Sequence, residues 1–123
     1  MKNLPQVWLV DDDESVRESL PDLLNELGFE VQAFSSGEEF LASGYQEQAG
    51  CLVLDIAMPG MSGPDVQREL AHRQHNIPII FITAHADATT RPRMIANGAV
   101  DCLSKPFSEA ALLDALDAAL RTG

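Results

Sequence analysis

The chain has 123 residues, of which 46% are hydrophobic and 22% charged, a composition that predicts one compact domain with a real core and excludes a disordered chain. Asp and Glu total 19 against 8 Lys and Arg, which gives a formal net charge of -11. Because such a surface repels nucleic-acid phosphates and anionic lipids, it argues against DNA or membrane binding by this chain. It suits a divalent cation, a basic partner or simply solubility.

No apolar stretch approaches the roughly 20 residues of a transmembrane helix, and residues 1–6 carry no signal-peptide pattern. We therefore expect a cytoplasmic protein. Cys51 and Cys102 each lie in an apolar run with no second cysteine nearby, so we expect small buried side chains and not zinc ligands.

Short apolar runs suited to β-strands alternate along the chain with segments of helical period. The runs cover residues 7–10, 31–34, 51–54, 77–82 and 100–103. After the first run, Ser15 and Glu18 form a capping-box pattern that predicts a helix ending at Gly28. Pro21 lies within this helix and predicts a kink or a late start, because proline removes one intrahelical N–H donor.

The second helix is short and is capped by one of two overlapping Ser-x-x-Glu patterns. These are Ser35 with Glu38 and Ser36 with Glu39.

The last three helices are also marked by their first residues. The third begins at Gly63 and Pro64, since proline is favoured at the first helical position. The fourth has its N-cap at Thr89 or Thr90, because a following proline fits only a first turn. Ser108 caps the fifth.

Strands that alternate with helices at this spacing predict an α/β fold, with a doubly wound parallel five-stranded sheet covered by helices on both faces. In such sheets ligands bind at the carboxyl ends of the strands, near the point where the strand order reverses. The residues directly after each apolar run are therefore the candidates for function.

Polar and charged side chains follow four of the five runs. They are Asp11, Asp12 and Asp13 after the first, Asp55 after the third, Thr83 after the fourth and Lys105 after the fifth. Crowded carboxylates repel one another, and Mg²⁺ suits them because it takes one or two carboxylates, a carbonyl and waters and leaves room for phosphate oxygens. Asp55 can then act as a nucleophile towards a phosphoryl group, while Lys105 and Thr83 hold its oxygens.

These residues carry a resemblance to the receiver domains of two-component response regulators, from Val7 to about Leu120. The motifs are Val-Asp-Asp-Asp-Glu-Ser-Val-Arg at 10–17, Asp-Ile-Ala-Met-Pro-Gly-Met-Ser-Gly at 55–63, Ile-Thr-Ala-His at 82–85, Asn-Gly-Ala-Val-Asp at 97–101 and Lys-Pro-Phe at 105–107. The pattern resembles the FixJ-like branch, whose members usually join a receiver to a LuxR-type helix-turn-helix domain. The resemblance implies one receiver domain over residues 1–123, with a flavodoxin-like (βα)5 fold and strand order 2-1-3-4-5.

The resemblance also implies a site. Asp55 would accept the phosphoryl group, and Mg²⁺ would be bound directly by Asp12, by Asp55 and by the Ala57 carbonyl, with Asp11 acting mainly through water. Lys105 and Thr83 would hold the phosphoryl oxygens, and the peptide before Pro106 would be cis.

The partners implied are those of a signalling domain and not of a dedicated enzyme. A phosphohistidine on a sensor histidine kinase would be the donor, so the chain would catalyse only its own phosphorylation and dephosphorylation. A phosphorylation-dependent homodimer and control of transcription through a C-terminal DNA-binding domain, absent from this chain, would follow.

Two positions depart from the family pattern. Relatives usually carry an aromatic residue three positions before the conserved lysine, where this chain has Cys102, and Pro92 falls where their fourth helix continues. Because a thiol is too small to report a movement of Thr83 by burying a ring, we expect intact phosphorylation with an altered output surface.

Two other interpretations remain open. The run Asp11-Asp12-Asp13-Glu14-Ser15 resembles the signature of haloacid-dehalogenase-type phosphatases, in which Asp11 would be the nucleophile and Asp13 the acid. The other interpretation is a receiver-fold interaction module that is never phosphorylated.

Overall fold

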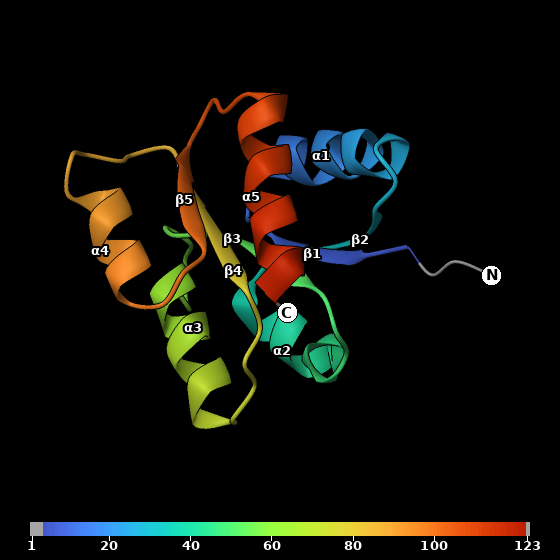
Figure 1. Ribbon diagram of the computed structural model, residues 1–123. Helices are drawn as coiled ribbons and strands as arrows, with labels where there is room; N and C mark the ends of the chain where they lie inside the picture. The colour runs from blue at the N-terminus through green and yellow to red at the C-terminus, as the bar shows by residue number, and fades with distance from the viewer. Residues whose placement is uncertain (1–3, 123) are drawn as a thin grey trace.

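A computed structural model describes residues 4–122, in which strands and helices alternate as predicted (Figure 1). The strands are β1 (Gln6–Val10), β2 (Glu30–Phe34), β3 (Cys51–Asp55), β4 (Ile79–Thr83) and β5 (Asp101–Ser104). The helices are α1 (Glu14–Glu26), α2 (Gly37–Ser43), α3 (Gly63–His72), α4 (Thr90–Ala96) and α5 (Glu109–Thr122). A short 3-10 helix, η1 (Tyr45–Glu47), was not predicted from the sequence.

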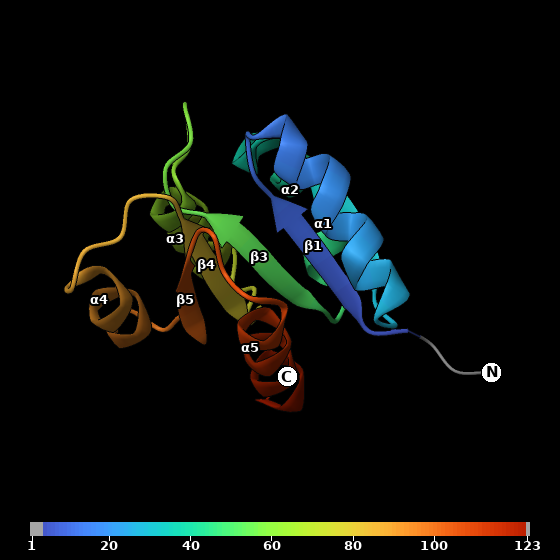
Figure 2. The same cartoon turned by 90° about the horizontal axis from the view of Figure 1, so that it is seen from above.

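The strands form one parallel sheet in the order β2-β1-β3-β4-β5, which confirms the predicted doubly wound, flavodoxin-like fold. The common direction of β1 and β3 can be followed in Figure 2. The order reverses at β1, because the chain passes from β1 to the edge strand β2 and returns on the other side of β1 as β3. Segments that follow β1 and β3 therefore meet at the switch point, where ligands bind in such sheets.

Each face of the sheet has its own core, because successive side chains of a strand point to opposite faces. Trp8, Leu52 and Phe81 pack with side chains of α2, α3 and α4. Leu9 and Val53 pack on the other face with side chains of α1 and α5. The central strands β1, β3 and β4 are buried almost throughout, so they form a rigid frame for the residues at their ends.

The fourth strand begins two residues later than predicted. Pro78 has no N–H to donate to the ladder, so β4 begins at Ile79. The Pro78 carbonyl still accepts the Leu52 N–H at 3.0 Å, which explains why the apolar run starts before the strand.

The predicted cap of the first helix was wrong. The N-cap of α1 is Asp13, whose carboxylate accepts the Ser15 N–H at 2.9 Å and the Ser15 hydroxyl at 2.8 Å. A carboxylate also interacts favourably with the positive end of the helix dipole, which a serine hydroxyl does not match. The alternative of a late start at Pro21 was wrong too, because Pro21 lies inside α1.

The other caps agree with the sequence. In α2, Ser36 accepts the Glu39 N–H at 3.1 Å, which decides between the two overlapping patterns. Thr89 is the N-cap of α4, one of the two predicted residues, and the Ser108 hydroxyl accepts the Ala111 N–H at 3.0 Å at the start of α5.

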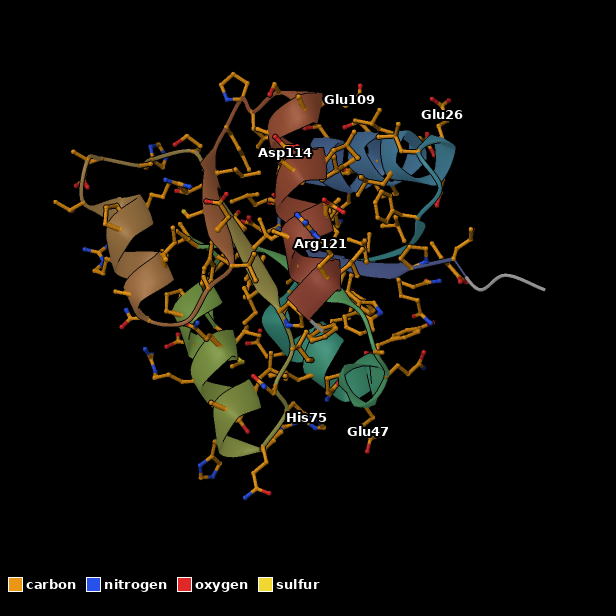
Figure 3. The ribbon with its side chains drawn as sticks, in the orientation of Figure 1. Glu26, Glu47, His75, Glu109, Asp114 and Arg121 are labelled. Atoms are coloured by element: carbon orange, nitrogen blue, oxygen red, sulfur yellow. The ribbon has the colours of Figure 1, made fainter. Side chains whose placement is uncertain are left out.

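Acidic side chains are prominent on the surface, as the net charge requires. On α1, Glu14, Glu18, Asp22 and Glu26 follow one another every fourth residue and are all exposed. Figure 3 shows Glu26 projecting away from the ribbon. None of the helices in the described part of the chain combines the length and apolarity of a membrane span.

Both cysteines are buried free thiols, as predicted.

Candidate functional site

The residues singled out from the sequence lie along the carboxyl edge of the sheet. Asp11 and Asp12 open the loop from β1 to α1, and Asp55 is the last residue of β3. Thr83 ends β4, and Lys105 directly follows β5. Since these strands are neighbours in the order β1-β3-β4-β5, residues that are up to 94 positions apart in the chain come into contact.

The centre of the site is a cluster of three carboxylates. Asp11, Asp12 and Asp55 each offer one oxygen, and these oxygens lie within 4.8 Å of one another. Asp11 is fully buried, Asp55 is 6% exposed and Asp12 is exposed. Hard oxygen donors in a partly open site suit Mg²⁺, which keeps several waters, better than Zn²⁺, whose protein sites nearly always include histidine or cysteine.

Lys105 supplies positive charge beside the cluster. Its Nζ donates to Asp11 Oδ2 at 2.8 Å and lies 3.8 Å from Asp55 Oδ2. Burial acts to lower the pKa of Lys105, but the hydrogen bond to Asp11 and the charge of Asp55 outweigh it and raise the pKa above its ordinary value. The amine is therefore a cation at neutral pH. The peptide between Lys105 and Pro106 is cis, as predicted.

The proton affinity of Asp55 is unusually high. Burial at the end of β3 is the main cause, the charge of Asp11 adds to it, and together they raise the pKa of Asp55 to about 7 although Lys105 opposes them. A cation that joins the cluster offsets the repulsion between the two carboxylates. Metal binding and ionisation of Asp55 therefore favour each other.

Asp11 is held by hydrogen bonds on every side. Its backbone N–H donates to the Phe34 carbonyl at 3.2 Å, and its Oδ1 accepts the Asp13 N–H at 2.9 Å. Its Oδ2 accepts Lys105, and its carbonyl accepts Nη1 of Arg17 at 2.9 Å. Both carboxylate oxygens of Asp11 are thus engaged by protein donors.

Thr83 is oriented by the backbone around it. Its Oγ1 accepts the His85 N–H at 3.1 Å, which leaves the hydroxyl hydrogen free to donate elsewhere. Its carbonyl accepts the Lys105 N–H at 2.8 Å, so the ends of β4 and β5 are fastened together. Ala57 is exposed next to Asp55, and its N–H donates to Asp55 Oδ1 at 3.4 Å.

Gly63, which the resemblance places in the loop after Asp55, supports the site through a contact that was not predicted from the sequence. A Cβ at this position would lie 2.5 Å from the Asp55 carbonyl oxygen and 2.9 Å from Cε1 of Phe81. Only glycine lets the start of α3 approach the end of β3 this closely. The Gly63-Pro64 pair indicated a helix start but gave no sign of this contact.

Arg17 was also missed as a contact of the site. It appeared in the sequence only as the last residue of a motif, and its bond to the Asp11 carbonyl spans six residues.

Comparison with known sequences shows a family. Residues 7–117 match the response regulator receiver domain. Nodulation protein W of Bradyrhizobium diazoefficiens is 50% identical over 113 residues, which are 92% of this chain and 50% of that protein. The transcriptional regulatory protein FixJ of Rhizobium meliloti is 41% identical over 113 residues, which are 92% of this chain and 55% of that protein. The chain spans about half the length of the curated relatives it matches.

Solved structures agree with the sequences. The response regulator StyR has a TM-score of 0.89 at 49% identity, over 98% of this chain and 61% of that one. FixJ-N has a TM-score of 0.87 at 39% identity, over 98% of this chain and 96% of that one. With the family match over most of its length and the same fold in these relatives, the chain belongs to the response regulator receiver domain family, with FixJ among its homologues.

Proposed function

We propose that residues 1–123 form one receiver domain that works as a signalling switch and accepts a phosphoryl group on Asp55. The supporting observation is the cluster of Asp11, Asp12 and Asp55 beside the Lys105 amine. Phosphoryl transfer depends on positioning and on neutralising the transferred oxygens, so a nucleophilic carboxylate needs a cation site and a fixed amine next to it.

The acid cluster fits Mg²⁺ as the cofactor. Asp12, Asp55 and the Ala57 carbonyl would bind it directly. Asp11 would act through water, because both of its carboxylate oxygens already accept protein donors. When bound, the ion would supply the positive charge that lets a carboxylate and phosphoryl oxygens approach each other.

The transfer step follows from the side chains around Asp55. One Asp55 oxygen would attack the phosphorus of a phosphohistidine, the bond from phosphorus to the imidazole nitrogen would break, and that nitrogen would keep the electron pair. The product is an acyl phosphate on Asp55. The Thr83 hydroxyl would donate to a phosphoryl oxygen, and Lys105, 3.8 Å from Asp55 Oδ2, would pair with another.

The donor that fits is a sensor histidine kinase in the cytoplasm, as for response regulators generally. Relatives carry names such as transcriptional regulatory protein, for example TdiR of Thauera aromatica and FixJ. We therefore propose that the output is transcription, through a C-terminal DNA-binding domain, and that the acidic receiver itself does not contact DNA.

A phosphatase with Asp11 as nucleophile is disfavoured by the contacts of that residue. Asp11 is fully buried, and Lys105 and the Asp13 N–H occupy its two oxygens. Asp13, the acid in that interpretation, caps α1 through Ser15.

The proposal is tested with acetyl phosphate as donor and intact-mass measurement. We expect one added phosphoryl group with Mg²⁺ and none with EDTA. Asp55→Asn should abolish the addition, whereas Asp117→Asn, an equal charge change at an exposed position of α5, should leave it intact. A wild-type domain that takes up no phosphoryl group would favour the interaction module instead.

A further inference from the structure

Arg17 contacts the acid cluster through the backbone and not through an ion pair. Its Nη1 donates to the Asp11 carbonyl oxygen at 2.9 Å, and its side chain is half-buried. Glu14 and Glu18 are close to it in sequence, yet within residues 4–122 no ion pair joins Arg17 to a carboxylate. The guanidinium is thus committed to a carbonyl despite the acids around it.

That carbonyl lies where the sheet no longer supplies partners. The β1–β3 ladder ends at the pair Val10 and Leu54, so the Asp11 carbonyl is beyond it. The backbone N–H of Arg17 donates to the Asp13 carbonyl at 3.2 Å. Arg17 is therefore hydrogen-bonded to both ends of the acidic turn, which we define as residues 11–13. The peptide between these two anchors is the one that carries Asp12.

Asp12 depends on this backbone for its position. It is exposed, and in the described part of the chain no hydrogen bond or ion pair fixes its side chain, unlike that of Asp11. Its carboxylate nevertheless lies within 4.8 Å of those of Asp11 and Asp55. Its position therefore follows from the path of the backbone through residues 11–13, which these hydrogen bonds fix.

We propose that Arg17 is a positioning residue that sets the cation affinity of the acid cluster through the Asp11 carbonyl. The proposal rests on the proposed function in one respect, namely that the cluster binds Mg²⁺. Two possible roles of Arg17 predict opposite changes in Mg²⁺ affinity when the residue is replaced. As a mere charge it repels Mg²⁺, so its removal would tighten binding, whereas as a positioning residue its removal weakens binding.

The test is calorimetric titration of the domain with Mg²⁺. Arg17→Met keeps the aliphatic length and removes the donors, and we expect roughly tenfold weaker binding, as is typical when a partner of a metal ligand is lost. Arg17→Lys, which keeps one donor group, should recover part of the loss. The control is Arg121→Met, an equal charge change at an exposed position of α5, which should bind as the wild type does or slightly more tightly.

A second readout needs no metal. In EDTA, amide exchange of the Asp13 N–H, which donates to Asp11 Oδ1, should be faster in Arg17→Met than in the wild type or in Arg121→Met. This separates a loosened acidic turn from a change in charge.

Thermal unfolding of each variant in EDTA shows the temperature range in which all of them are folded, and the titrations are run within that range. If Arg17→Met does not fold, Arg17→Gln, whose amide is too short to replace the guanidinium, is judged by the same criterion. Wild-type affinity or tighter binding in the variant overturns the inference and leaves the proposed function intact. A wild-type domain that binds no Mg²⁺ overturns both.

Discussion

Asp55 meets two opposing demands in the metal-free domain. Its place at the end of β3, beside Asp11, raises its pKa to about 7, mainly through burial. A nucleophile towards phosphorus must be ionised. The cost of ionising this carboxylate without a cation is therefore built into the stability of the fold, where it can be measured.

Asp55→Asn is expected to change the free energy of unfolding of the domain by an amount that depends on pH. Between about pH 4 and 7 an unfolded chain has ionised this carboxyl group while the folded domain keeps it protonated. The folded state then binds more protons, so the wild type loses stability as pH rises through this window. In EDTA, Asp55→Asn should exceed the wild type by on the order of 1–2 kcal/mol at pH 8, and the gap should close near pH 4.

Urea unfolding followed by circular dichroism at several pH values measures this gap. Asp117→Asn is the control, because it makes the same charge change at an exposed position of α5 outside the acid cluster. Mg²⁺ at pH 8 should bring the wild type back towards the variant. A gap that is equally large at pH 4 and pH 8 would contradict the expected cause.

The residues of the site differ in how well their positions and contacts could be predicted from the sequence. Asp55, Thr83 and Lys105 could be placed because each ends or follows an apolar run, and parallel topology brings strand ends together. The contacts of Arg17 and Gly63 could not be predicted, because a bond to a carbonyl six residues away and a 2.5 Å approach to the Asp55 backbone depend on the tertiary path of the chain.

A residue just beyond α3 has an unusual backbone conformation. Gln74 follows the C-cap of α3, Arg73, and its φ of 64° lies in the left-handed region that glycine tolerates best. Its N–H still donates to the Ala71 carbonyl at 3.0 Å, so the turn itself is well bonded. The strain at this positive φ therefore comes from the Cβ of Gln74, which crowds the neighbouring backbone, and not from a missing hydrogen bond in the turn.

Gln74→Gly should therefore stabilise the domain by about 0.5 kcal/mol, because relief of strain exceeds the added freedom of the unfolded chain. Ala71→Gly, at an exposed helical position, is the matched control and should destabilise by about 1 kcal/mol. Urea unfolding of both variants is the measurement. A loss of stability in Gln74→Gly as large as that in the control would refute the expectation.

Gly63→Ala tests the contact between α3 and the end of β3. The added Cβ has to displace the Asp55 carbonyl or Phe81, so we expect a loss of about 2 kcal/mol and slower phosphoryl uptake from acetyl phosphate. Gly28→Ala is the control, because its φ of 97° makes it costly while no atom lies within 4 Å. It should lose stability without slowing uptake, and equal slowing in both variants would remove the special part given to Gly63.

For the strands and helices, the alternating periods in the sequence were enough to predict their order. The N-caps were harder to predict, because neighbouring residues can compete for the same cap position. Ser15 lost the N-cap of α1 to Asp13, which can accept from both the N–H and the hydroxyl of Ser15. The short helix η1 was missed because a single 3-10 turn leaves no periodic pattern.

The whole molecule is expected to transmit phosphorylation differently from its relatives. Cys102 is 4% exposed and packs in the core with Phe81 and Met94, so it offers no ring that could move inward when Thr83 shifts. In place of the phosphorylation-dependent homodimer that the family resemblance implies, we expect the phosphorylated and unphosphorylated domains to form homodimers equally. Sedimentation with and without beryllofluoride measures this, and a sharp increase in dimer on its addition would refute the expectation.

The proposed switch depends on carboxylates from separate strands that meet so that one of them, Asp55, can take up a phosphoryl group. The domain is treated with acetyl phosphate and Mg²⁺ and then reduced with borohydride, which converts an aspartyl phosphate to homoserine, and peptide mass spectrometry locates the homoserine. The expected result is homoserine at position 55 in the wild type and none in Asp55→Asn. Homoserine at position 11 in the wild type would contradict it.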